Sequence, residues 1–205
     1  MIQRSEEWFS ARLGKVTASR IADVMAKTKT GYSASRQNYM MELLTERLTG
    51  ERTESYQSAD MLWGIEHEDE SRELYESITG NTVMQVGFII APDNINAGAS
   101  PDGLIGIDGG LEIKCPKTAT HVNYILTENI DTKYIYQMQW GMYCTNRMWW
   151  DFVSYDPRMH KKLRIFIKRV DRDEDMINNI RNEVYKFLDE LNEIEKKLKE
   201  KINGL

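Results

Sequence analysis

The chain has 205 residues, enough to bury one substantial hydrophobic core but few for two, so we expect a single domain over residues 1–205. Hydrophobic residues make up 41% and charged residues 29%, which excludes a disordered or low-complexity chain. No apolar run approaches the roughly 20 residues of a membrane span, and the first residues lack the apolar core of a signal peptide. The sequence therefore predicts a cytoplasmic protein with no membrane partner.

The formal net charge is −5, from 27 Lys and Arg residues against 32 Asp and Glu residues, which argues against a protein that simply coats nucleic acid. A protein that binds metal ions with carboxylates needs positive charge only along the path of the nucleic acid's phosphate backbone. Residues 156–169 offer such a track, with Asp156 as the lone acid. Its cations are Arg158, Lys161, Lys162, Arg164, Lys168 and Arg169.

Helices are predicted for the first part of the chain. Ser5 opens a helix that ends at Gly14, and Thr17 or Ser19 is placed to cap a second, short one. Apolar residues at helical spacing predict a third helix from about 35 to 49, which Gly50 closes.

A longer helix is predicted from about Ala59 to Thr79. Its apolar residues form one stripe: Met61, Ile65, Tyr75 and Ile78. Glu68 and Arg72 fall on the same stripe by steps of three and four residues. An acid on an inward stripe needs a partner, so Glu68 is a candidate functional residue.

The middle of the chain predicts a sheet. Residues 82–90 are a strand candidate, and residues 97–114 form two or three short strands broken by turns at Asp102-Gly103 and Asp108-Gly109-Gly110. Helical spacing returns from Tyr134 to Met142.

Two further strands are predicted near residues 149–155 and 163–170, before a long amphipathic helix from about Asp173. The apolar side of that helix fits either the core or a neighbouring subunit. These elements predict an α/β or α+β domain, with a central mixed β-sheet flanked by helices and a long C-terminal helix.

The chemistry is concentrated in residues 99–116. In an extended strand, residues two apart share a face, so Glu112 and Lys114 point the same way while Leu111, Ile113 and Cys115 point into the core. A hairpin turn then brings Asp102 alongside them.

Two carboxylates on one face repel each other and favour a bound cation. Oxygen-only ligands favour magnesium or manganese over zinc. Such an ion can polarise a phosphoryl oxygen and activate water, and a lysine beside it can stabilise charge at phosphorus or take a proton from the water. Either fragment alone is usually structural, a Pro-Asp-Gly turn or a solvated Glu-x-Lys face, so the combination carries the interpretation.

These residues resemble the phage lambda exonuclease and YqaJ-like viral recombinase family, within the PD-(D/E)xK nuclease superfamily. The resemblance covers most of the chain, in order. The matching blocks are Arg12-Leu13-Gly14, Thr17-Ala18-Ser19, Trp63-Gly64 with Glu68, Ser100-Pro101-Asp102-Gly103, Leu111-Glu112-Ile113-Lys114-Cys115-Pro116, Tyr136-Gln137-Met138-Gln139 with Met142, and Tyr155-Asp156-Pro157-Arg158-Met159. It implies a restriction-endonuclease-like core.

The resemblance also implies roles for single residues. Asp102, Glu112, the carbonyl of Ile113 and Glu68 would hold magnesium, with two ions at the site and manganese as a substitute. Lys114 would act on the water, with Gln139 supporting Lys114 or the metal. The terminal 5′-phosphate of DNA would be held by Arg12, Ser19 and Ser100. Further possible DNA contacts are Thr17, Lys117, His121, Gln137 and Arg158.

The activity implied is that of an alkaline-type 5′–3′ deoxyribonuclease, which degrades one strand of linear double-stranded DNA and leaves a 3′ overhang. The family forms a homotrimer ring around DNA, and in phage recombination the overhang it produces passes to a single-strand annealing protein. One position departs from the family pattern. An arginine that grips the terminal phosphate in the lambda enzyme is replaced by Thr120 here, with Lys117 or His121 as substitutes.

Three rival functions remain. A structure-specific or restriction-type endonuclease shares the core but cuts circular DNA. A Cas4-like nuclease needs an iron–sulfur cluster, and the two cysteines, Cys115 and Cys144, are too few for one and are expected to be buried thiols. A non-catalytic DNA-binding recombination scaffold does not need Glu68, Asp102, Glu112 and Lys114 together.

Overall fold

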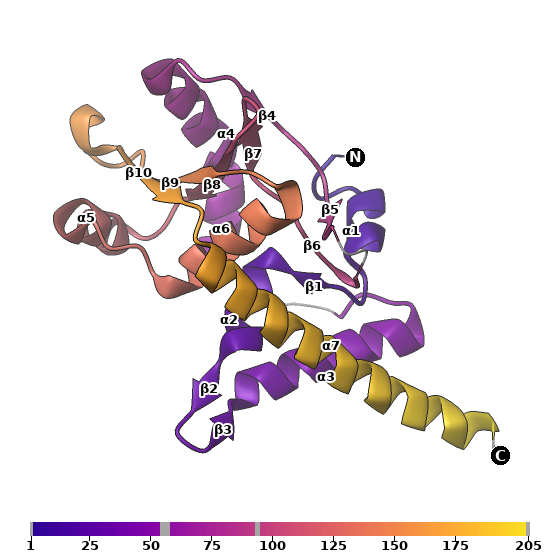
Figure 1. Cartoon of the computed structure of the whole chain (residues 1–205). Coiled ribbons are helices and arrows are strands. Elements are labelled where there is room, and N and C mark those ends of the chain that lie inside the picture. Colours follow the sequence, from indigo (N-terminus) through magenta and orange to yellow (C-terminus); the bar gives the residue numbers. More distant parts are fainter. Residues whose placement is uncertain (1, 54–57, 93–94, 204–205) are drawn as a thin grey trace.

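The computed structural model describes residues 2–53, 58–92 and 95–203. The elements follow the chain in the order shown in Figure 1: α1 (Glu6–Arg12), β1 (Val16–Thr17), η1 (Ala18–Arg20), α2 (Ile21–Met25), β2 (Lys27–Thr28), β3 (Gly31–Tyr32), α3 (Ala34–Thr49), α4 (Ala59–Thr79), β4 (Val83–Met84), β5 (Ile89–Ile90), β6 (Ala97–Ala99), β7 (Gly103–Ile105), β8 (Gly109–Lys114), α5 (Thr118–Thr127), α6 (Thr132–Thr145), β9 (Trp149–Tyr155), η2 (Lys161–Leu163), β10 (Ile165–Asp171) and α7 (Glu174–Asn203).

The largest sheet is mixed and has the strand order β10-β9-β8-β7-β4. β8 and β9 run parallel, which requires a long crossover, and α5 with α6 supplies it. A second sheet has the order β1-β6-β5, and β2 with β3 forms a separate hairpin. This confirms the predicted mixed sheet flanked by helices.

Polar caps set several helix ends where the sequence predicts them. The Ser5 side chain accepts from the Trp8 N–H at the start of α1, and Ser33 and Ser58 cap α3 and α4 in the same way. Gly50 ends α3 with φ 71°, a left-handed conformation that glycine adopts without a steric penalty. The predicted cap at Thr17 or Ser19 is wrong: Thr17 makes no side-chain cap hydrogen bond to η1, and Ser19 lies within η1, next to Arg20, which is the N-cap of α2.

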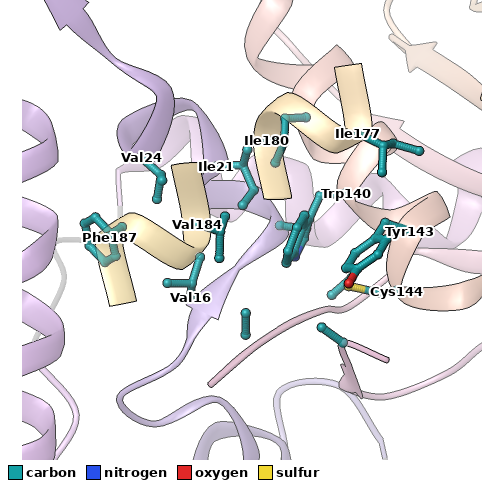
Figure 2. Packing of buried hydrophobic residues seen from close by; sticks show 14 of the residues in the cluster. Val16, Ile21, Val24, Trp140, Tyr143, Cys144, Ile177, Ile180, Val184 and Phe187 are labelled. Carbon is teal, nitrogen blue, oxygen red and sulfur yellow. The ribbon is translucent and has the colours of Figure 1, made fainter. Parts of the chain in front are cut away.

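The C-terminal helix packs on the core of its own chain. Its inward residues Ile177, Ile180, Val184 and Phe187 are 2% exposed or less, and they face Val16, Ile21, Val24 and Trp140 (Figure 2). Burial of each large aliphatic side chain contributes roughly 1.5–3 kcal/mol. The apolar face of α7 therefore stabilises this domain as far as Leu198, and the end of the helix lies at the edge of the molecule (Figure 1).

Three sequence predictions are corrected. The turn expected at Asp108-Gly109-Gly110 is wrong in part, because Gly109 and Gly110 belong to β8. Both positions need glycine because the Trp149 and Trp150 rings pack against them: a Cβ on Gly110 would lie 2.4 Å from the Trp150 ring. The strand expected at 82–90 is two short strands, β4 and β5, in different sheets. On α4, Tyr75 is buried, but Met61 and Ile78 are 53% and 56% exposed.

The structure also contains a helix, α5, that the sequence patterns did not predict. Its buried residues His121 and Tyr124 pack it against the sheet. No helix in the described part of the chain is both long and apolar enough to cross a membrane.

Candidate active site

The β7–β8 hairpin brings the predicted acids together. Gly103 pairs with Leu111 in the antiparallel register, which places the preceding Asp102 beside Glu112 and Ile113. The Ile113 N–H donates to Asp102 Oδ2 at 2.7 Å, which fixes this carboxylate against β8. The hairpin therefore creates the juxtaposition that the sequence predicted.

Glu112 and Lys114 lie on the same face of β8, as strand alternation requires. Glu112 is 2% exposed, and its Oε1 forms an ion pair with Lys114 Nζ and accepts from Gln137 Nε2 at 2.6 Å. Leu111 and Ile113 are buried in the core, as predicted.

Burial and neighbouring charges shift the pKa values of these groups in opposite directions. Burial, the Glu112 charge and the Glu68 charge together raise the pKa of Asp102 well above its usual range, although Lys114 lowers it. Burial also raises the pKa of Glu112 despite its contacts with Lys114. Burial alone would lower the pKa of Lys114, but Glu112 and Asp102 outweigh it and raise that pKa. Crowded acids of this kind favour a cation.

Glu68 reaches the same place from α4. Its side chain is 18% exposed, and Arg4 Nη2 lies 2.5 Å from Glu68 Oε2. Glu68, Asp102 and Lys114 line one cavity of about 700 Å³, with Lys117, Thr120 and Tyr134 also on its walls. Three of the four predicted chemical side chains therefore face one cavity, and the fourth, Glu112, contacts Lys114 directly.

A second cavity of about 390 Å³ is lined by two of the three residues predicted for phosphate binding, Arg12 and Ser19. Arg12, Thr17 and Ser19 line it, and Arg12 Nη1 donates to Ser100 Oγ at 2.9 Å. Ser100 Oγ also accepts from Trp8 Nε1 at 2.9 Å. Burial lowers the pKa of Arg12 to about 10, so its guanidinium remains charged at neutral pH. Ser100 stands two residues before Asp102, so its hydrogen bond with Arg12 connects a wall residue of the smaller cavity to the segment that carries Asp102.

Two predicted placements are corrected. Gln139 does not reach Lys114: its amide accepts from the Asp173 N–H and donates to the Asp171 carbonyl, at the junction of β10 and α7. Neighbouring Gln137 contacts Glu112 instead. His121, a predicted DNA contact, is fully buried, with hydrogen bonds to Ser154 Oγ and the Leu163 carbonyl.

The basic track at 156–169 is not continuous. Arg158 forms an ion pair with buried Asp156 and also donates to the Pro116 carbonyl, whereas Arg169 forms an ion pair with Asp151. Lys168 and Arg169 are neighbours on β10 and so point to opposite faces. Lys117 lies on the rim of the larger cavity, where it pairs with Asp60.

A metal ion was predicted from the oxygen donors. Among the residues that the structure describes, no three His, Cys, Asp or Glu side chains are close enough to form a metal site. Instead, Lys114 neutralises Glu112 and Arg4 neutralises Glu68. The donor chemistry fits a hard cation, because burial and two nearby acids raise the pKa of Asp102 and the available ligands are oxygens. Metal binding stays a prediction.

The fold and these side chains are those expected of a nuclease with the PD-(D/E)xK arrangement. Residues 7–148 match the model of the YqaJ-like viral recombinase domain, and the chain belongs to this family. The resemblance noted in the sequence is thus confirmed, and the family supports a nuclease role. No curated protein sequence matches the chain.

Solved structures agree with the family. The alkaline exonuclease LHK-Exo from Laribacter hongkongensis is 49% identical, with a TM-score of 0.91 over 98% of this chain and 99% of that chain. A complex of LHK-Exo with dAMP gives 50% identity with the same TM-score, 0.91, and the same coverage, 98% and 99%. A phage related exonuclease from Haemophilus somnus 129PT, 14% identical, shares the fold with a TM-score of 0.73 over 90% of this chain and 96% of that chain.

The two glutamines provide a matched test of the corrected placement. Gln137→Ala should lower the nuclease rate about ten-fold, because residues that orient a ligand usually contribute 10–100-fold, while the melting temperature stays unchanged. Gln139→Ala should instead lower the melting temperature, because it removes two hydrogen bonds between α6 and the start of α7, and leave the rate of the folded enzyme close to wild type. If Gln139→Ala lowers the nuclease rate and Gln137→Ala lowers only the melting temperature, Gln139 is the residue that supports the site, as the sequence predicted.

Proposed function

We propose that this protein is a magnesium-dependent 5′–3′ exonuclease that degrades one strand of linear double-stranded DNA and leaves a 3′ single-stranded overhang. The observation that carries the proposal is the meeting of two cavities. One is lined by Glu68, Asp102 and Lys114, the other by Arg12 and Ser19, and both share wall residues Arg4, Met61 and Ile65. LHK-Exo, called an alkaline exonuclease, binds dAMP, a mononucleotide of the kind this reaction releases.

The carboxylates would hold magnesium. Asp102, Glu112, Glu68 and the carbonyl of Ile113 are the proposed ligands, for two ions, and manganese would substitute. When bound, the metal supplies Lewis acidity at the scissile phosphodiester. Gln137 holds the Glu112 carboxylate in place through its Nε2, so the orientation of this ligand is set before substrate arrives.

Lys114 would act directly on the reacting phosphate. Its side chain is 25% exposed and lines the cavity beside Asp102. An ammonium at this position can stabilise the negative charge that develops on the phosphoryl oxygens during displacement. Positioned charge of this kind lowers the barrier by about 3 kcal/mol.

The smaller cavity would set the polarity. Arg12 presents a guanidinium, which matches the geometry of phosphate oxygens, and the hydroxyls of Ser19 and Ser100 add hydrogen-bond partners. A terminal 5′-phosphate held there would place the first phosphodiester bond near Asp102 and Lys114. Cleavage would then start from the 5′ end and release mononucleotides.

The proposed assembly and recombination partner are those that the family resemblance implies. We propose a homotrimer ring around the DNA and transfer of the 3′ overhang to a single-strand annealing protein, in phage-type recombination. Sedimentation of the purified protein tests the ring: a mass three times the 23.9 kDa of the chain is expected.

The decisive experiment compares DNA ends. Linear duplexes with a 5′-phosphate or a 5′-hydroxyl, and covalently closed circles, are incubated with magnesium or with EDTA. We expect loss of linear DNA in magnesium alone, release of mononucleotides from a 5′ label, and slower digestion of the 5′-hydroxyl substrate. Cutting of closed circles would indicate an endonuclease, and binding without cleavage would indicate the non-catalytic scaffold.

A further inference from the structure

Arg4 occupies the boundary between the two cavities. It lines both of them, together with Met61 and Ile65. Its side chain is 43% exposed, and its Nη2 lies 2.5 Å from Glu68 Oε2. A charged side chain in this place is accessible to any ligand that extends from one cavity to the other.

The backbone at Arg4 is held in an unfavourable conformation. Its φ is 67°, in the left-handed region that non-glycine residues rarely adopt. The Ser5 N–H donates to the Ile2 carbonyl at 3.3 Å, so Arg4 is the third residue of a turn, a position where glycine or asparagine is usual for such a φ. An arginine at this position therefore carries a conformational cost that a glycine would avoid.

Neighbouring contacts keep the turn in place. Gln3 Nε2 donates to the Pro101 carbonyl at 2.7 Å and to the Val86 carbonyl at 3.0 Å. Pro101 directly precedes Asp102, so the turn that carries Arg4 is attached to the segment that carries the candidate metal ligand. The start of the chain lies beside β5 and β6 in Figure 1, in agreement with these contacts. Strained residues that persist because their surroundings fix them occur preferentially at functional sites.

The charge distribution indicates which ligand this arginine serves. The larger cavity is lined by four carboxylates, those of Asp60, Glu68, Asp102 and Asp131, which repel a polyanion. Among its cations, Lys114 is paired with Glu112 and Lys117 with Asp60. A guanidinium has five N–H donors in a rigid fork, and the ion pair with Glu68 engages Nη2. Arg4 can therefore keep its contact with Glu68 while other N–H groups donate to a phosphate oxygen.

We propose that Arg4 is a phosphate-binding residue, which holds a backbone phosphate of the DNA strand that spans the two cavities. This inference rests on the proposed function, because it requires a nucleic acid substrate. In this arrangement Arg4 both neutralises Glu68 and offsets the repulsion between the acidic cavity and the incoming strand.

The test measures DNA binding without catalysis. Wild type, Arg4→Gln and Arg4→Gly are titrated against a short fluorescent 5′-phosphorylated duplex in EDTA, at several salt concentrations. Both variants are expected to bind about ten-fold more weakly at low salt, with the slope of log K against log salt reduced by roughly 0.7–0.9, the value for one lost phosphate contact. Arg4→Gly should keep or raise the melting temperature, because glycine removes the strain at φ 67°.

Lys196→Gln is the matched control. It also removes one positive charge, from an exposed position on α7 that lines neither cavity, and it should leave both affinity and slope unchanged. If Arg4→Gln binds DNA as tightly as wild type with the same slope, the inference is wrong and Arg4 serves only as the counterion of Glu68. Failure of wild type itself to bind DNA in EDTA, together with failure to degrade linear DNA in magnesium, would instead reject the proposed function.

Discussion

Lys114→Ala is expected to lower the rate of DNA cleavage by about a thousand-fold, because removal of one positioned group that stabilises transition-state charge typically raises the barrier by 2.7–4 kcal/mol. The side chain stands at the end of β8, where its ammonium contacts Glu112 and faces the cavity that Asp102 lines. Single-turnover cleavage at saturating DNA measures the chemical step. Affinity for DNA in EDTA should change only by the loss of one charge.

Lys117→Ala is the control for this variant. Lys117 is a lysine on the rim of the same cavity, but its ammonium pairs with Asp60 at 3.1 Å rather than with the buried acids. Its removal should weaken binding in a salt-dependent way and leave the saturated single-turnover rate within about three-fold of wild type. A Lys114→Ala enzyme that retains more than a tenth of the wild-type rate would contradict the catalytic role.

Arg147→Met is expected to lower the free energy of unfolding by about 3 kcal/mol. Arg147 Nη1 donates to the carbonyl oxygens of Ile105, Gly106 and Gly109, at 3.0, 3.0 and 2.7 Å. These carbonyls lie in the turn between β7 and β8 and at the strand ends on either side of it, and the arginine is 9% exposed. Hydrogen bonds to charged groups contribute about 1.5–3 kcal/mol, and buried carbonyls that lose a donor destabilise the fold further.

Urea unfolding at constant m-value measures this effect. Arg164→Met is the comparison, because Arg164 Nε also donates to a backbone carbonyl, that of Met159, but is less buried. Its free energy of unfolding should fall by less than about 1 kcal/mol. The same hairpin sets Asp102 beside Glu112. The nuclease activity of Arg147→Met should therefore fall more steeply with rising temperature than the activity of wild type. Equal stabilities for the two variants would show that the turn does not depend on Arg147.

Local sequence determined much of the secondary structure and the centre of the site. Serine caps and left-handed glycines act within one helical turn, so the bounds of α4 agree with the prediction at both ends. Strand alternation likewise acts over two residues, and it placed Glu112 and Lys114 on one face. The family blocks gave the order of the acids along the chain, because motif spacing is itself a property of sequence.

Contacts between distant segments decided the rest. α5 has no side-chain cap at its start and contains β-branched residues, and the burial of His121 and Tyr124 against the sheet favours its helical form. Gln137 and Gln139 differ by two positions on one helix, a rotation of roughly 200°, so only the docking of α6 determines which of them meets Glu112.

Arg4 shows the limit most clearly. Nothing within its own segment signals a role, since a lone arginine near a helix start is usually solvated. Its position depends on Gln3, which reaches carbonyls 83 and 98 residues further along the chain, and its partner Glu68 is 64 residues away. Short-range patterns cannot encode such pairings, because the free energy that fixes them comes from packing and hydrogen bonds formed only when the whole domain folds.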